Sequence, residues 1–158
     1  MYSIKETNDY HALSKLFHDS GMEVEVEDVA PQETIKMWRC DNDETGELLA
    51  GAVLQFKSGC YVLEDLAVTE RYRGKGLGKT MMDIALDEAR RLGAEEIWGC
   101  AKVPDYYFQY NWQEMDRETS PEISHCQSCK QFGKSCFPCI IKKELYCIEE
   151  KLAQTGTK

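Results

Sequence analysis

A short glycine-rich segment, residues 73–80, constrains this chain more than any other feature. It has the sequence Arg-Gly-Lys-Gly-Leu-Gly-Lys-Thr and lies between an apolar strand pattern and an amphipathic helix pattern. Glycines at alternate positions allow the backbone to turn tightly and to approach a bulky anion. A helix beginning at Gly78 would direct its free N–H groups and the positive end of its dipole toward that anion. The segment therefore predicts a phosphate- or pyrophosphate-binding loop.

Two well-known phosphate loops do not fit this segment. A Walker A loop requires a first glycine where this chain has Arg73, although Gly78-Lys79-Thr80 supplies the expected ending. The dinucleotide fingerprint also fails, because the third glycine comes one residue early. The pattern Arg/Gln-x-x-Gly-x-Gly/Ala does fit, and residues 73–78 match it.

This pattern resembles the coenzyme A pyrophosphate loop of the GNAT acyltransferase superfamily. The strand pattern Tyr61–Val68, the helix pattern Gly78–Leu92 and the chain from Leu48 to Trp112 are similar to that family. The resemblance implies an α/β (α+β) fold, with a mixed, mainly antiparallel twisted sheet flanked by helices, in one domain spanning 1–158. The alternative is a glycine-rich turn that binds no ligand.

The resemblance implies that acetyl-CoA is held mainly by backbone N–H groups. Those of Leu66 and Val68 would pair with the pantetheine arm, and the N–H of Leu66 would polarise the thioester carbonyl. The loop would hold the pyrophosphate, with Arg73 or Lys79 adding charge. The expected cofactor-binding residues are Leu66, Ala67, Val68, Arg73, Gly74, Lys75, Gly76, Leu77, Gly78, Lys79 and Thr80.

Acyl transfer from a thioester to an amine needs a base for the amine and a proton donor for the departing thiolate. Glu64 and Asp65 lie on the strand that enters the loop. Successive side chains on a strand face opposite ways, so we expect only one of them to face the acceptor. By resemblance Glu64 is the base and Asp65 the alternative; both could instead be structural.

The aromatic segment 106–112, Tyr-Tyr-Phe-Gln-Tyr-Asn-Trp, is similar to a second family signature. It implies that Tyr107 donates a proton to the thiolate, with Tyr106 and Tyr110 as alternatives in another register. Asn111 stands where the family commonly has glycine, and Asn also tolerates positive φ. The alternative is that Tyr107 only packs in the core.

Eight cysteines in a chain without a secretory signal favour metal binding or free thiols over disulfides. Two CxxC pairs can complete a tetrahedral zinc site. An iron–sulfur cluster, free thiols or a redox pair are the alternatives. We expect the surrounding residues 120–140 to be an insertion between the last two strands. The predicted ligands are Cys126, Cys129, Cys136 and Cys139.

The net charge of −9 argues against nucleic acid as a partner, and no apolar run approaches the length of a membrane span. We therefore expect a cytoplasmic protein. Residues 1–70 hold 15 acidic and 5 basic residues, and the segment Glu23–Asp28 is strongly acidic. That charge could attract a polyamine, an aminoglycoside or a basic peptide, or it could simply be a solvated surface.

Taken together, the sequence predicts an acetyl-CoA-dependent N-acetyltransferase acting by direct attack in a ternary complex. Its acceptor would be a small-molecule amine, or the N-terminus or a lysine of a peptide, and by resemblance the protein could form a homodimer. One alternative is a non-catalytic acyl-CoA sensor with a metal- or redox-responsive cysteine cluster. Another is a metal-binding interaction protein that uses the fold as a scaffold.

Overall fold

The computed structural model describes residues 1–123 and 139–145, which form two compact units. The first unit comprises residues 1–57 and 62–85, and the second contains residues 58–61 and the described residues from Leu86 onward. No helix in the described ranges is long and apolar enough to cross a membrane.

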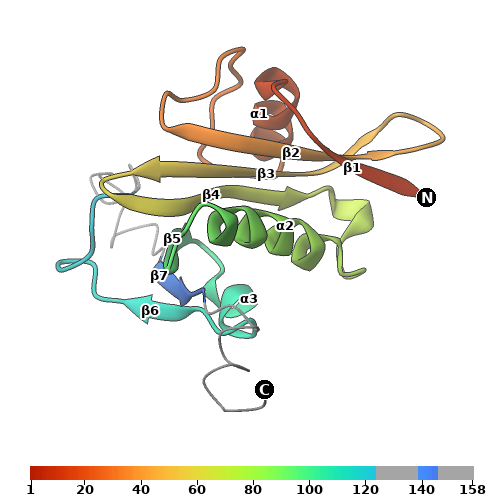
Figure 1. The fold of residues 1–158 in the computed structure, drawn as a ribbon. Coiled ribbons are helices and arrows are strands. Elements are labelled where there is room, and N and C mark those ends of the chain that lie inside the picture. Colours follow the sequence, from red (N-terminus) through yellow and green to blue (C-terminus); the bar gives the residue numbers. More distant parts are fainter. Residues whose placement is uncertain (124–138, 146–158) are drawn as a thin grey trace, which may run out of the picture. The chain divides into compact units, whose positions relative to one another are not determined.

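The first unit is built on four neighbouring strands in chain order, with α1 packed on one face over β3 (Figure 1). β1 pairs antiparallel with β2, and β2 with β3, as an antiparallel meander requires. Gly51 of β3 lets α1 approach closely, because an added Cβ would lie 2.6 Å from the Leu13 side chain. Its elements are β1 (Tyr2–Glu6), α1 (Tyr10–Asp19), β2 (Thr34–Asn42), β3 (Leu48–Lys57), β4 (Cys60–Val68), the 3-10 helix η1 (Glu70–Tyr72) and the beginning of α2 (Leu77–Arg91).

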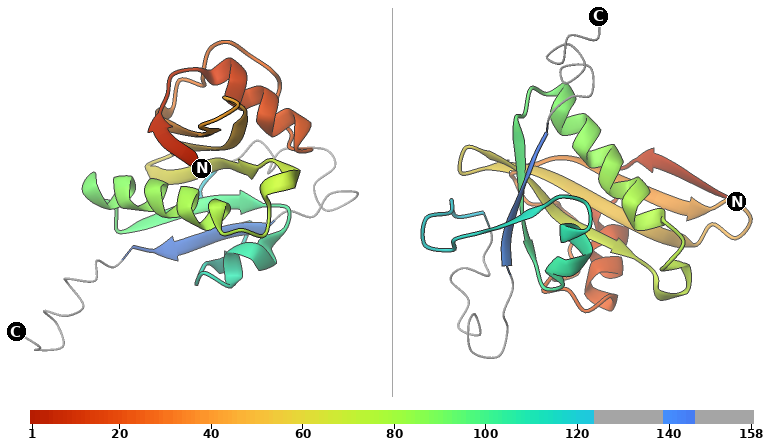
Figure 2. Two further views of the ribbon diagram at one scale, coloured as in Figure 1. Left: turned by 90° about the vertical axis from the view of Figure 1, so that its right-hand side faces the viewer. Right: turned by 90° about the horizontal axis from the view of Figure 1, so that it is seen from below.

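The second unit contains the end of α2 and three further strands. β7 lies between β5 and β6 and pairs antiparallel with both (Figure 2). Gly93 ends α2 at φ +95°, and the N–H groups of Gly93 and Ala94 cap the last carbonyls. The elements are β5 (Glu96–Ala101), α3 (Pro104–Phe108), β6 (Gln113–Met115) and β7 (Cys139–Glu144).

The expected α/β architecture with mainly antiparallel strands is confirmed. Asp9 caps α1 by accepting a hydrogen bond from the N–H of Ala12 at 3.1 Å. The sequence pattern indicated neither η1 nor the three-residue strand β6. A strand as short as β6 has too few residues to show alternation and exists through its pairing with β7.

Candidate active site

The glycine-rich loop has the geometry of an anion-binding turn. Gly74 and Gly76 adopt φ of +79° and +84°, in the left-handed region that favours glycine. The first intrahelical bond of α2 runs from the N–H of Thr80 to the carbonyl of Gly76, so the N–H groups from Leu77 to Lys79 precede the hydrogen-bonded ladder. Within the described residues, no backbone carbonyl accepts from the N–H groups of Gly74, Lys75 or Gly76. The loop and the helix end together therefore present a run of donors.

A tyrosine just before the loop connects it to the β2–β3 hairpin. The side-chain amide of Asn42 donates to Tyr72 Oη at 3.1 Å, while Asn42 Oδ1 accepts from two N–H groups of its own turn. The Lys75 ammonium lies 4.9 Å from the centre of the Tyr72 ring, within cation–π range. Arg71 also lies over this ring and pairs with Glu47 of the hairpin. These contacts were not expected from the sequence, and they hold the Lys75 side chain over the Tyr72 ring.

The two cations expected to add charge to the loop have intramolecular partners. Arg73 Nε donates to the carbonyl of Val68 at 2.8 Å, which closes the turn between β4 and the loop. Lys79 pairs with Asp83, one helical turn along α2, at 2.6 Å. Lys75 is exposed and lies between the two left-handed glycines. It is the cation best placed by the loop itself.

Strand β4 carries one residue more than the matching stretch of β3. Ser58 and Gly59 both have positive φ, as in the two-residue turns that join antiparallel strands. The N–H of Thr69 donates to the carbonyl of Leu49 at 2.7 Å, so residues 49–57 are matched against residues 60–69. The register between β3 and β4 thus shifts by one residue between the hairpin turn and this hydrogen bond, as at a β-bulge.

The two carboxylates of β4 interact electrostatically with the same neighbouring side chains. Asp65 and Glu64 both raise the pKa of Tyr10 on α1. Lys57 of β3 pairs with Glu64 at 3.3 Å and also acts electrostatically on Asp65. Both carboxylates therefore act electrostatically on Tyr10, and the expectation that only one of them faces the acceptor stays a prediction.

The two carboxylates differ in burial. Asp65 is only 8% exposed, and burial, reinforced by the nearby negative charge of Glu64, raises its pKa to about 8 against a smaller opposing effect of Lys57. Glu64 is half-buried and engaged by Lys57. A carboxyl group that titrates near neutral pH is the type of group that functions as a general base.

Two further buried polar residues of the first unit were missed by the sequence analysis. Tyr10 of α1 is 5% exposed, and burial followed by the charge of Asp65 raises its pKa to about 12. Gln55 of β3 is 1% exposed, and its Oε1 is buried without a hydrogen-bond partner among the described residues. Tyr10 fits the apolar pattern of an amphipathic helix and Gln55 lies in a buried strand, so nothing in their local sequence marked them.

The aromatic segment is ordered around α3 in the second unit. The rings of Tyr107 and Trp112 meet edge to face, with centroids 5.4 Å apart, and Trp112 is buried. Tyr106 contacts both Tyr107 and Tyr110 in the same manner. Asn111 has φ +70°, so its predicted positive φ is confirmed.

The predicted metal site lies mostly outside the described residues, which include neither Cys126, Cys129 nor Cys136. Cys139 begins β7 opposite Ala101, and burial raises the pKa of its thiol. Among the described residues, no group of three or more His, Cys, Asp or Glu side chains could hold a metal ion.

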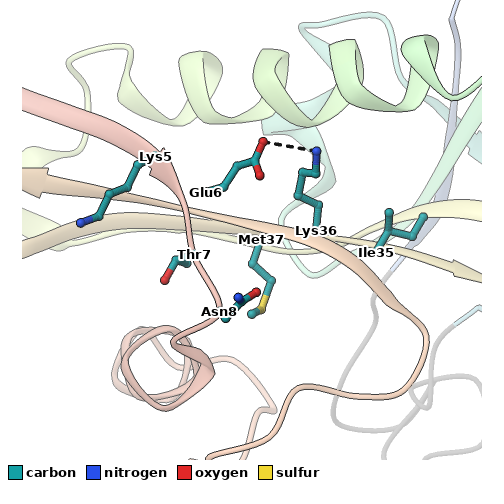
Figure 3. A pocket seen from close by; sticks show the side chains of 7 residues that line it. All are labelled: Lys5, Glu6, Thr7, Asn8, Ile35, Lys36 and Met37. Atoms are coloured by element: carbon teal, nitrogen blue, oxygen red, sulfur yellow. Dashed lines mark ion pairs between the residues drawn. The ribbon is translucent and has the colours of Figure 1, made fainter.

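A pocket at the edge of the first unit is lined by other residues than those described so far. It has a volume of about 430 Å³ and contains none of the predicted site residues. Figure 3 shows Glu6 and Lys36 pointing toward each other across its rim, with an ion pair of 3.2 Å. Its lining residues are Lys5, Glu6, Thr7, Asn8, Ile35, Lys36 and Met37.

Solved structures similar to this chain share its fold. N-acetylglutamate synthase from Neisseria gonorrhoeae, complexed with coenzyme A and N-acetyl-glutamate, superimposes with a TM-score of 0.69 at 16% identity; the match covers 93% of this chain but 36% of that one. Nourseothricin acetyltransferase gives 0.63 at 16% identity, covering 92% of this chain and 99% of that chain. The ribosomal-protein-S18-alanine N-acetyltransferase from Escherichia coli gives 0.65 at 14% identity, covering 93% and 96%.

A comparison with curated protein sequences finds no match. The sequence profile described as the Acetyltransferase (GNAT) family matches residues 6–107. That match spans well over half of the chain and includes β4, the glycine-rich loop and α2, so the chain belongs to the GNAT acetyltransferase family.

Proposed function

We propose that this protein transfers the acetyl group of acetyl-CoA to a primary amine by direct attack in a ternary complex. The observation that carries the proposal is the glycine-rich loop. Its two left-handed glycines and the first turn of α2 leave consecutive backbone N–H groups without backbone partners among the described residues. Such an arrangement binds a pyrophosphate without requiring a specific side chain. The similar synthase structure contains coenzyme A, which is consistent with this proposal.

We assign the general base to Asp65 in preference to Glu64, which the sequence had favoured. The burial of Asp65 supports this choice, because burial raises the pKa of its carboxyl to about 8. A base is most effective when its pKa lies near the working pH. The Glu64 carboxylate is instead paired with Lys57 at 3.3 Å, and its proposed role is to help raise the pKa of Asp65.

In the proposed reaction, the acceptor ammonium gives one proton to the Asp65 carboxylate. The resulting amine attacks the thioester carbon, so that a C–N bond forms and the C–S bond breaks with its electron pair going to sulfur. Tyr107 donates a proton to the thiolate, and the second proton lost by nitrogen restores the Tyr107 hydroxyl through solvent. The products are the amide, coenzyme A as its thiol and a proton on Asp65. By family resemblance the Leu66 N–H polarises the carbonyl and the Val68 N–H aligns the pantetheine.

Binding of the cosubstrate is the first test. Acetyl-CoA, coenzyme A and ATP are compared in a thermal-shift series. Stabilisation by the two coenzyme A species that grows with their concentration is expected, with none by ATP. No shift with either coenzyme A species would refute the proposed function. Turnover is then followed as thiol release across a panel of primary amines, and binding without turnover on any amine would favour the sensor alternative.

The roles of the side chains are tested by conservative variants. We expect Asp65→Asn to lower kcat by roughly 10²–10⁴-fold with little change in acetyl-CoA affinity, the usual effect of removing a general base. Glu64→Gln should lower kcat less than Asp65→Asn does. Tyr107→Phe should also lower kcat, and its effect should be largest at high pH. Equal activity of Asp65→Asn and the wild type would remove Asp65 from the mechanism.

A further inference from the structure

A buried group of polar side chains lies beneath α1, and one of its acceptor atoms has no hydrogen-bond partner among the described residues. Asp65, Tyr10 and Gln55 are exposed by only 8%, 5% and 1%. No side-chain hydrogen bond joins Asp65 or Tyr10 to another residue of the described ranges. Gln55 Nε2 reaches Thr34 Oγ1 at 3.5 Å, while its Oε1 is buried without a partner there.

The three groups lie on one face of the strands. Val53 and Tyr10 belong to the same core cluster beneath α1. Val53, Gln55 and Lys57 alternate along β3, so they share that face. Lys57 reaches Glu64, and Asp65 acts on both Lys57 and Tyr10. Gln55 is therefore flanked by Val53, which packs in the same cluster as Tyr10, and by Lys57, which acts on both carboxylates.

Buried polar atoms without partners cost stability, so native proteins keep few of them unless a ligand or water fills the need. Here the buried atom without a partner among the described residues is the amide oxygen of Gln55, and it lies on the same face as the Asp65 carboxyl and the Tyr10 hydroxyl. A primary ammonium has three N–H donors directed away from one centre. Such a group could donate to the Gln55 amide oxygen, to the Tyr10 oxygen and to an ionised Asp65 carboxylate at once, whereas an anion could not pair with Gln55 Oε1.

The acidic segment 23–28 is attached to α1 beside this group. The buried hydroxyl of Ser14 accepts from the Glu27 N–H at 3.0 Å and donates to the Glu27 carbonyl at 3.2 Å. His11 contacts Asp28 at 2.8 Å. The Glu27 carboxylate also acts electrostatically on Tyr10, although it is exposed. The segment thus brings negative charge to the rim of the buried group.

Resting on the proposed function, we propose that the acceptor is a primary amine carrying a second positive charge, whose reacting ammonium is received by Asp65, Gln55 and Tyr10 and whose second cation faces the segment 23–28. The chemistry is shared by a di- or polyamine and by a peptide with a basic residue next to its reacting amine.

Acceptors of equal chain length test the second charge. With saturating acetyl-CoA, kcat/KM is measured for pentylamine, 1,5-diaminopentane and 5-aminopentanoate. We expect the diamine to exceed pentylamine by roughly fivefold and the amino acid by more than about tenfold, as for one partly screened charge contact. The preference should shrink when NaCl is raised from about 0.02 to about 0.5 M. Equal kcat/KM for the three would overturn the proposal while leaving the acetyltransferase function intact.

Two variants with a matched control locate the charges. Glu27→Gln should reduce the preference for the diamine, whereas Glu95→Gln, the same charge change at an exposed site of the second unit, should not. Tyr10→Phe removes one acceptor without changing side-chain volume. It should raise the KM for the diamine several-fold and leave acetyl-CoA affinity unchanged. A loss of preference that is equal in Glu27→Gln and Glu95→Gln would refute the placement of the second cation.

Proton release provides a readout independent of turnover. Near pH 7 the Asp65 carboxyl is largely protonated in the free protein, and a bound ammonium would displace that proton. Calorimetry of diamine binding in buffers of different ionisation enthalpy should show release approaching one proton, absent in Asp65→Asn. Binding without proton release would overturn the role of Asp65 in receiving the ammonium. Failure of coenzyme A binding would instead identify a failure of the proposed function.

Discussion

Replacing Gly76 by alanine separates the loop's role in binding from its role in the fold. Gly76 has φ +84°, and an added Cβ would meet no heavy atom within 4 Å. The substitution therefore introduces backbone strain and no clash. An L-residue in the left-handed region costs about 1–2 kcal/mol. Because the loop is exposed, the free protein can relieve this strain by changing φ.

Coenzyme A binding would have to restore the left-handed conformation, so the same 1–2 kcal/mol would appear as roughly a fivefold to thirtyfold weaker Kd for acetyl-CoA. The melting temperature of the free protein should change little. Gly93→Ala is the matched control, because Gly93 also has positive φ and open space at its Cβ.

Gly93 is fixed by capping hydrogen bonds at the end of α2, so its strain cannot relax. Gly93→Ala should lower the melting temperature by a few degrees, about 2–4 °C per kcal/mol, without affecting acetyl-CoA affinity. Both quantities are measured by calorimetric titration and thermal unfolding. Gly76→Asn should lie between wild type and Gly76→Ala, because asparagine tolerates positive φ. Wild-type affinity in Gly76→Ala would refute the assignment of this loop to the pyrophosphate.

Three further predictions concern other parts of the chain. Burial raises the pKa of Asp65 to about 8 in the folded protein, so the fold holds a proton that the unfolded chain lacks between about pH 4 and 8. The free energy of unfolding should therefore fall as pH rises through that window, by at most about 1.4 kcal/mol per pH unit, and urea titrations should show a shallower slope in Asp65→Asn. Tyr72→Leu removes the ring beneath Lys75 and should raise the KM for acetyl-CoA several-fold with kcat unchanged, in steady-state kinetics. Elemental analysis should find less zinc in Cys129→Ser than in the wild type; equal content, or no zinc in either, would remove the metal prediction.

The elements that the sequence predicted well are those whose pattern is local. The apolar residues of α2 repeat at helical spacing and its arginines and Gly93 mark the end, so its bounds differ from the prediction by one residue at each end. The predicted strand Tyr61–Val68 likewise differs from β4, Cys60–Val68, by one residue. The loop was found because its glycines are needed for backbone conformation, which depends on no distant residue.

The base assignment shows where local patterns fail. Alternation along β4 predicts that Glu64 and Asp65 face opposite sides, but it does not tell which of the two is buried. Burial of Asp65, the pairing of Glu64 with Lys57 and the nearness of Tyr10 are likewise tertiary. No residue type within β4 marks which carboxyl will titrate near neutral pH.

By itself, the sequence determined the family, the phosphate loop and the order of most elements, because glycine conformation, helix periodicity and strand alternation are properties of neighbouring residues. Only the tertiary structure decided which polar groups are buried together. The cluster of Tyr10, Gln55 and Asp65 joins a helix and two strands that lie far apart along the chain. The unpaired amide oxygen of Gln55 arises from packing, since burial removes water and leaves each polar atom dependent on whatever the fold, or a ligand, places beside it.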